Sequence, residues 1–296
     1  MIRPPEEMEN FCRRLVLRKE HTLKELERIE SSANSKLKLV NKLHNHKYRK
    51  EENLFVADGI RLAEMAIQAQ WPVKFALAAT ESLSNPRVVK AVEELQERKC
   101  PVYELSQDLY SKVSDTVNGQ GLLLVMGQRL FTWQEVLTGK EGEAPLLAVL
   151  DGIQDPGNAG NIIRTADALG CTGVICLTGT VDLFSDKVVR ASMGSIFNIP
   201  FLDNVSRGTF VDACHDNDVI MVATALDKLS LKHYLAEYNS PTAVVFGNEG
   251  NGVSQELMEA VDRKVYIPMS GKAESLNVAS AAAIVLYEAN RQRAIL

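Results

Sequence analysis

The hydrophobic and polar positions of the chain form two blocks, in which short apolar runs alternate with segments of helical periodicity. In the first block, residues 37–126, the runs VKFALAA, PVYEL and LLLVM predict strands. Apolar residues at helical spacing predict helices over residues 58–70, from Pro86 onwards and over SQDLYSKVS. This alternation indicates a small α/β unit.

The second block begins with the run LLAVLDGI and continues with GVICLT, VIMVATAL, TAVVFG and VYIPM. Each run is followed by a loop and a helical pattern, which favours a mostly parallel sheet covered by helices. The segment between the blocks, GQRLFTWQEVLTGKEGEAP, is rich in Gly and charge and is typical of a linker. Before the first block, Leu15, Leu23, Leu26 and Ile29 recur at roughly helical spacing.

These patterns give the expected domain organisation. We expect a charged helical extension over residues 1–35, a first α/β domain over 36–127, a linker over 128–144 and a second α/β domain over 145–296. With 296 residues, of which 46% are hydrophobic and 24% are charged, the chain is long enough for two separate cores.

Cysteine usage and apolar run lengths bear on the compartment. The cysteines are scattered, odd in number and lack a CxxC pair, so neither a disulfide framework nor a zinc site is indicated. They are Cys12, Cys100, Cys171, Cys176 and Cys214. The start of the sequence has no signal-peptide core, and no run approaches the roughly 18 apolar residues of a membrane helix. We therefore expect a cytoplasmic protein without a metal site or a membrane partner.

Charge is distributed unevenly along the chain. The net charge of -5 argues against a protein that coats nucleic acid generally, but residues 31–50 contain only basic charged residues. Such a stretch is a local footprint for phosphate groups, although a solvated helix face has the same composition. The candidates for RNA binding are Lys42, Lys47, Arg49 and Lys50.

The first of three unusual loops follows the strand LLAVLDGI. In open parallel sheets, ligands bind beyond the carboxyl ends of the strands, so loops at these positions are candidate sites. Residues 151–170 form a turn rich in Gly and Asn that leads into a helix and carries Asn158, Asn161 and Arg164. Its unpaired backbone N–H groups suit an anion. The alternative is that the asparagines only cap the helix and that Arg164 makes a surface ion pair.

The other two loops follow the strands TAVVFG and VYIPM. Gly247, Gly250 and Gly252 surround Glu249, and glycines at this density allow a ligand to approach the backbone closely. In the last loop, Ser275-Leu276-Asn277 leads into an alanine-rich helix. Ser275 or Asn277 as an N-cap explains one polar residue more easily than both.

Several other chemistries are poorly supported. No GxGxxG follows the first strand of the second domain, and no GxxxxGK[ST] or GxSxG occurs. Asp151 and Asp155 could bind a cation, but His215 and His233 lie far away in sequence and complete no ligand cluster. A nucleotide-dependent oxidoreductase, a P-loop enzyme, a metalloenzyme and a serine hydrolase are therefore disfavoured.

Together, NAGNIIRTADALG, VVFGNEGNGVS and IPMSGKAESLNVASAAAIVLYEANRQR resemble, in order and spacing, the three signature motifs of the SpoU (TrmH-like) family of the SPOUT methyltransferase superfamily. The resemblance spans residues 146–293, and the unit from 37 to 126 is similar to the L30e/L7Ae-like substrate-binding domain of many such enzymes. It implies an α/β fold whose parallel sheet is tied in a deep trefoil knot. It also implies a homodimer that uses S-adenosyl-L-methionine to methylate a ribose 2'-hydroxyl in structured RNA.

The resemblance also implies roles for individual residues. Gly247, Asn248, Ile267 and Leu276 match positions that bind the cofactor. Arg164 matches the arginine that acts on the ribose hydroxyl, and its expected partners in the catalytic site are Asn158, Glu249, Ser275 and Asn277.

The chemistry of methyl transfer is consistent with these roles. The 2'-oxygen must be aligned with the methyl carbon and must lose its proton. A guanidinium is a poor base, so Arg164 is expected to steer the phosphate and stabilise the alkoxide, while another group or water takes the proton. Ribosomal RNA of the large subunit is the preferred substrate. Transfer RNA and a non-catalytic RNA-binding dimer stay open as alternatives.

Overall fold

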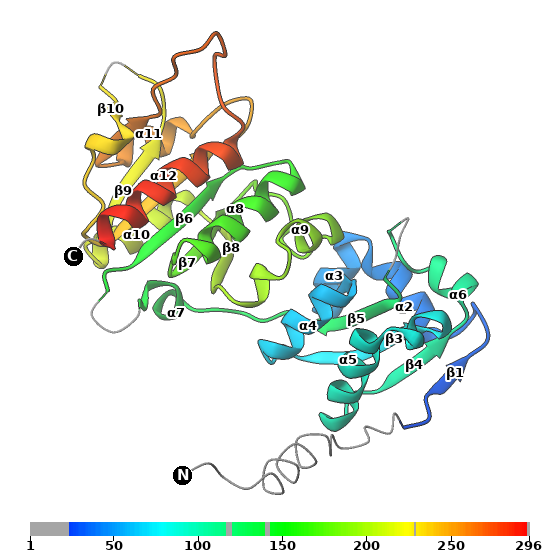
Figure 1. Cartoon of the computed structure of the whole chain (residues 1–296). Helices are drawn as coiled ribbons and strands as arrows, with labels where there is room; N and C mark the ends of the chain where they lie inside the picture. Colours follow the sequence, from blue (N-terminus) through cyan, green and yellow to red (C-terminus); the bar gives the residue numbers. More distant parts are fainter. Residues whose placement is uncertain (1–23, 117–119, 140–142, 228, 295–296) are drawn as a thin grey trace, which may run out of the picture.

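The computed structural model describes residues 24–116, 120–139, 143–227 and 229–294. Within these residues the chain forms two α/β units, which lie side by side (Figure 1). Among them, no helix is both long enough and apolar enough to cross a bilayer. The expected helical extension lies mostly in residues 1–23, outside the described residues.

The N-terminal unit is a sandwich with a mixed sheet of order β1-β4-β3-β5-β2 between two helical layers. β1, β4 and β3 are parallel, whereas β5 runs antiparallel to β3 and β2. One face packs on α2 and α6, and the other packs on α4 and α5. The strands are β1 (Glu27–Ile29), β2 (Leu54–Asp58), β3 (Val73–Ala79), β4 (Val102–Leu105) and β5 (Leu122–Gly127). The helices are α2 (Ser35–Leu43), α3 (His46–Glu52), α4 (Ile60–Gln68), η1 (Thr80–Ser84), α5 (Pro86–Glu97) and α6 (Gln107–Ser111).

The first strand of this unit, β1, lies where a helical extension was expected over residues 1–35. Leu26 and Ile29 were assigned to an amphipathic helix, but residues 27–29 form β1, which pairs with β4. Ile29 is buried in the core on the α2 side of the sheet. Pairing with a neighbouring strand overrides the local helical spacing because it satisfies the backbone and buries Ile29 at once.

The C-terminal unit contains a sheet that is parallel throughout, in the order β10-β12-β9-β11-β6-β7-β8. α8 and α12 cover one face, and α7, α10 and α11 cover the other. The strands are β6 (Leu146–Asp151), β7 (Gly173–Leu177), β8 (Phe201–Val205), β9 (Ile220–Thr224), β10 (Leu231–Lys232), β11 (Thr242–Gly247) and β12 (Arg263–Tyr266). The helices are α7 (Trp133–Leu137), α8 (Pro156–Ala168), α9 (Asp186–Ala191), η2 (Ser195–Phe197), α10 (Arg207–Asp216), η3 (His233–Leu235), α11 (Gln255–Ala260) and α12 (Val278–Arg293).

The fold class expected from the sequence is confirmed in its architecture, a large parallel sheet preceded by a small α/β domain. The interior strand β6 is buried throughout, and its side chains alternate between the two helical layers. That is why its sequence is a continuous apolar run rather than a polar and apolar alternation. The expected linker is partly structured, because α7 buries Val136 beneath β6 and β7.

An aromatic cluster joins the two units. Phe55 and Trp71 from the N-terminal unit contact Phe184, with ring centroids 4.7 and 6.5 Å apart, respectively. The indole Nε1 of Trp71 also donates to the carbonyl of Phe197 at 2.9 Å. These residues belong to one continuous buried core that extends through both units. The units therefore form a single packed body.

Phe184→Ala should destabilise both units together, by about 3–5 kcal/mol, because it removes a buried ring shared by them. Guanidinium unfolding, followed by tryptophan fluorescence and far-UV circular dichroism, should show one coincident transition at lower denaturant. Leu130→Ala is the control, because Leu130 is 89% exposed and should have almost no effect. Separate transitions for the two probes would contradict the shared core.

Candidate functional site

The loops after β6, β11 and β12 meet at the carboxyl edge of the parallel sheet. A cavity of about 440 Å³ lies there, and its lining includes the four residues expected to bind a cofactor. These are Gly247, Asn248, Ile267 and Leu276. Glu249, Ser275 and Asn277 line the same cavity, so the second and third motifs converge as expected.

The loop after β11 closes on itself. Asn248 and Gly252 exchange two backbone hydrogen bonds of 2.9 Å, which form an isolated bridge. A Cβ on Gly247 would lie 2.1 Å from the backbone of Gly252 and Val253. Glycine is therefore required at position 247 by the loop itself, and the backbone edge of the strand stays open to the cavity.

A buried carboxylate anchors this loop to β6. Asp151, 2% exposed at the end of β6, accepts hydrogen bonds from the backbone N–H of Ser254 at 2.7 Å and from Arg207 at 2.6 and 2.9 Å. Asn248 Nδ2 donates to the carbonyl of Gly152 at 2.8 Å. Both ends of the loop are thereby held against the β6 terminus.

Glu249 accepts three hydrogen bonds from the first motif. Its carboxylate receives the backbone N–H groups of Gln154 and Asp155, both at 3.1 Å, and Asn158 Nδ2 at 2.9 Å. Burial alone raises the pKa of Glu249, but these donors outweigh it and the pKa lies below its ordinary value. Glu249 is therefore an ionised acceptor that holds the entry to α8.

The charge of Glu249 fixes the direction of the next two contacts. Asn158 has to present its NH₂ group to a carboxylate that can only accept, so its Oδ1 faces Asn277. Asn277 Nδ2 donates to that oxygen at 2.8 Å. The Oδ1 of Asn277 then accepts from the N–H groups of Ala279 and Ser280, which caps α12. Asn277 is thus the N-cap of α12 and also the last residue of the hydrogen-bonded row Glu249–Asn158–Asn277.

Arg164 occupies a neighbouring position. It is exposed on α8 and lines a hollow of about 820 Å³ between α8 and α12. Asn277 lines both this hollow and the 440 Å³ cavity, and so it links Arg164 to the second and third motifs. The alternative of a surface ion pair finds no support, since Arg164 makes none with the residues that the structure describes.

The basic stretch divides into two parts. Lys42, Lys47 and Lys50 are exposed, and the Lys42 and Lys47 ammonium groups lie 5.5 and 5.9 Å from the ring centroid of Tyr48. Arg49 is different, because it is only 5% exposed and its guanidinium contacts Asp182 of the C-terminal unit at 2.7 Å. The assignment of Arg49 to an RNA footprint is therefore corrected: it is an interdomain contact.

The sequence interpretation missed part of the cavity wall. Leu226, Met269 and Glu274 also line it, and Leu226 comes from the loop after β9. Leu226 is the last residue of the predicted strand VIMVATAL, which ends two residues earlier in the structure, so its position at the sheet edge was available as a signal. The composition of this loop, without clustered glycines or asparagines, gave no chemical reason to select it. Among the described residues, no group of three or more His, Cys, Asp or Glu is placed to hold a metal ion.

An apolar cavity beside a fixed row of one carboxylate and two amides, at the carboxyl edge of a parallel sheet, defines an α/β enzyme that binds a small organic molecule. Residues 145–287 match the family described as SpoU rRNA Methylase family, and residues 34–124 match the MRM3-like substrate binding domain. The chain belongs to the SpoU rRNA methylase family.

Individual relatives agree along most of their length. The 23S rRNA (guanosine(2553)-2'-O)-methyltransferase RlmP of Bacillus subtilis is 35% identical over 265 residues, which are 88% of this chain and 98% of that protein. The solved structure of the AdoMet-bound rRNA methyltransferase from Sinorhizobium meliloti has a TM-score of 0.80 and 32% identity, and the match covers 90% of this chain and 98% of that one. The AdoMet complex of the SpoU methyltransferase AviRb from Streptomyces viridochromogenes has a TM-score of 0.78 and 29% identity, over 89% and 100% of the two chains.

Arg207→Ala should destabilise the fold by about 3 kcal/mol or more, because it leaves the Asp151 carboxylate buried without its cation. Arg87→Ala is the matched control: its ion pair with Glu64 spans 2.6 Å, but both side chains are exposed, at 58% and 40%. That loss should be much smaller, because water screens an exposed ion pair. Denaturant unfolding measures both, and equal losses would contradict an anchoring role for Asp151.

Proposed function

We propose that this protein transfers a methyl group from S-adenosyl-L-methionine to a ribose 2'-hydroxyl in ribosomal RNA of the 23S type. The observation that carries this proposal is the convergence of the second and third motifs on one cavity, to which Asn158 of the first motif is joined through Glu249 and Asn277. The relatives named above, two of which are 23S rRNA or rRNA enzymes by name, support the substrate class.

The cavity suits an adenosyl group in size and chemistry. Its volume, about 440 Å³, falls in the usual range for small-molecule sites. Ile267, Leu276 and Val285 offer apolar surface to a purine, while Glu249 and Ser275 contribute polar atoms on the same lining. When bound, the cofactor supplies an electrophilic methyl group on a sulfonium.

The protein's own residues would then position the acceptor. Arg164, exposed beside Asn277, attracts the substrate phosphate and stabilises negative charge on the 2'-oxygen. Glu249 positions the acceptor and does not take its proton, because its lowered pKa makes it a weak base and its oxygens already accept three hydrogen bonds. We assign the proton to water, with Ser275 and the Asn158–Asn277 pair orienting the ribose.

Further parts of the proposal concern assembly, topology and location. The hollow between α8 and α12 is lined by Leu169, Ala283, Ile284 and Tyr287, and Tyr287 is 60% exposed. Apolar surface on two adjacent helices suits a second copy of the chain, so we propose a homodimer through this face. The trefoil knot is proposed from the family resemblance. A reducing location, the cytoplasm, is consistent with the free thiols of Cys100, Cys171, Cys176 and Cys214.

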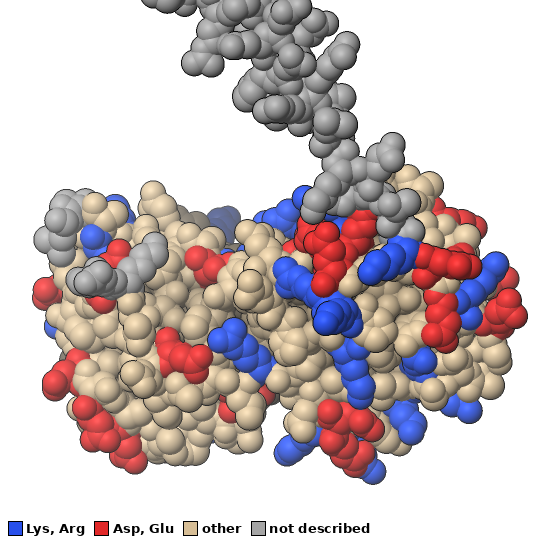
Figure 2. Space-filling model, turned by 90° about the horizontal axis from the view of Figure 1, so that it is seen from below, with Lys and Arg blue, Asp and Glu red and all other residues tan. Residues whose placement is uncertain are grey.

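The RNA-binding surface that we propose lies on α2 and α3. Lys42, Lys47 and Lys50 are exposed there, and Lys42 and Lys47 lie beside the Tyr48 ring, a combination that suits phosphates and a base. On the side seen in Figure 2, Lys and Arg over the N-terminal unit are interspersed with Asp and Glu. Such mixed charge makes that side a weaker anion site than the lysines of α2 and α3.

The test of function is transfer of labelled methyl groups to purified 23S rRNA and to bulk transfer RNA, followed by alkaline hydrolysis. Label in alkali-resistant dinucleotides is expected, because 2'-O-methylation blocks cleavage of the adjacent phosphodiester. Label in mononucleotides would show base methylation instead, and label only in transfer RNA would change the substrate class.

Arg164→Ala should reduce turnover by about 100-fold or more, while the affinity for the cofactor, measured by calorimetry, should be retained. Arg98→Ala, an exposed arginine after α5, is the control.

Replacing Lys42, Lys47 and Lys50 together with Gln should weaken RNA binding and make the slope of log affinity against log salt shallower by about 2–3. Cofactor affinity should not change, because none of the three lysines lines the cavity. The same replacement at Lys74, Lys90 and Lys99, of which Lys90 lies on α5 in the opposite helical layer, is the control. Equal effects of the two triple variants in filter binding would mean that α2 and α3 are only a solvated surface.

A further inference from the structure

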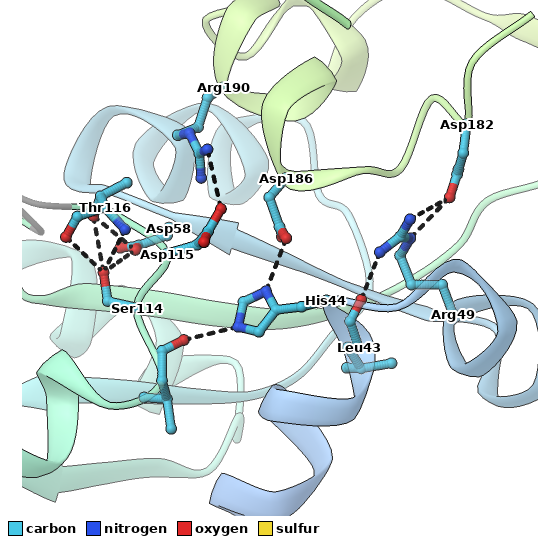
Figure 3. Close-up of polar contacts among 11 residues, drawn as sticks. Leu43, His44, Arg49, Asp58, Ser114, Asp115, Thr116, Asp182, Asp186 and Arg190 are labelled. Atoms are coloured by element: carbon cyan, nitrogen blue, oxygen red, sulfur yellow. Dashed lines mark hydrogen bonds and ion pairs between the residues drawn. The ribbon is translucent and has the colours of Figure 1, made fainter.

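Ion pairs join the two units (Figure 3). Arg49 Nε and Nη2 donate to Asp182 at 2.8 and 2.7 Å, and Arg190 contacts Asp115 at 3.4 Å. The third contact is between His44 and Asp186, at 2.8 Å. Each contact joins the N-terminal unit to α9 or to the loop before it.

His44 has an acceptor at each ring nitrogen. Nδ1 lies 2.8 Å from Asp186 Oδ2, and Nε2 lies 3.0 Å from the carbonyl oxygen of Val113 (Figure 3). A carbonyl and an ionised carboxylate can only accept, so both ring nitrogens have to donate. The alternative, a neutral ring beside a protonated carboxyl group, places the proton on the weaker base, because a carboxylate is a weaker base than an imidazole. The geometry thus requires an imidazolium.

The charges around His44 favour the same state. Asp186 faces it from α9, and Asp115, which pairs with Arg190, faces it from the loop after α6. The hydrogen bond to Asp186, opposed by burial, raises the pKa of His44 above its ordinary value. His44 also follows α2 as its C-cap, where the helix dipole stabilises positive charge. The remaining charged pair in the interface, Arg49 with Asp182, has His46 Nε2 3.9 Å from the carboxylate.

The contact of His44 with α9 is relayed to the catalytic helix. α9 packs on α8 so closely that a Cβ on Gly160 would lie 2.4 Å from the Cβ of Ala191. α8 carries Asn158 and Arg164. On the other side, α2 carries Lys42, two residues before His44. The RNA-binding lysines and Arg164 are therefore connected through α2, His44, Asp186, α9 and α8.

We propose that the doubly protonated His44 is a positioning residue, which sets the orientation of the RNA-binding surface relative to Arg164 and the cofactor cavity. This inference rests on the function proposed above for its consequence in catalysis. The charge state itself depends only on the contacts of His44.

The sign of the pH dependence follows from the raised pKa. The stabilisation of the interface by His44 is fully present below the ordinary pKa of about 6.5, and it is lost as the pH rises through the higher folded value. Proton removal from a ribose hydroxyl changes with pH in the opposite direction, because base favours it. The Michaelis constant for RNA, rather than turnover, is therefore the quantity that reports on His44.

The charge state is tested by NMR of protein labelled with ¹⁵N-histidine, and His44→Gln assigns the signals of His44. At about pH 7, where a free imidazole is mostly neutral, both nitrogens of His44 should have imidazolium shifts. A neutral tautomer at this pH would overturn the proposal. This measurement needs no RNA. If the wild type transfers no methyl group, the proposed function fails while the signals still decide the charge of His44.

The positioning role is tested by kinetics of the wild type, His44→Gln and Asp186→Asn. At about pH 7 both variants should raise the Michaelis constant for RNA by about tenfold and leave that for S-adenosyl-L-methionine unchanged. The RNA constant of the wild type should rise towards theirs as the pH is raised above neutrality, while that of His44→Gln stays flat. His215→Gln, the same substitution at an exposed residue of α10, is the control. Wild-type RNA constants and pH dependence in both variants would overturn the positioning role.

Discussion

The ionised carboxylate of Glu249 is the contact on which the order of the site depends. Because it can only accept, it determines which way the Asn158 amide faces, and Asn158 then determines the orientation of Asn277. In that orientation, the Oδ1 of Asn277 caps α12. One charge thus connects the loop after β11 to the starts of α8 and α12, and these contacts define the shape of the cavity.

The parallel sheet and its loops could be predicted well because their signals are local. Continuous apolar runs such as residues 146–151 indicate buried parallel strands, and glycines and asparagines directly after them indicate an edge with open backbone. The convergence of Gly247, Ile267 and Leu276 on one cavity is consistent with their resemblance to family motifs. Periodicity alone places no residue next to another from a distant segment.

The sequence could not predict features that depend on contacts between residues far apart in the chain. β1 occurs where helical spacing was noted, because its partner β4 lies more than seventy residues away. Arg49 was grouped with the exposed lysines because composition cannot separate a cation that faces water from one that faces Asp182. The same limit applies to His44, whose two acceptors come from separate parts of the chain. A basic stretch can therefore contain both exposed cations and a buried interdomain contact.

The ion pairs between the N-terminal unit and α9 limit how domains can be exchanged between related enzymes. A graft cut at the apparent linker would transfer α2 and α3 but leave Asp182 and Asp186 behind, and so it would separate the ion pairs of Figure 3. Residues 182–197 are part of the C-terminal unit in sequence, but they form the surface on which the N-terminal unit packs. A chimera that exchanges the N-terminal unit to obtain a new RNA target should therefore exchange residues 182–197 together with it.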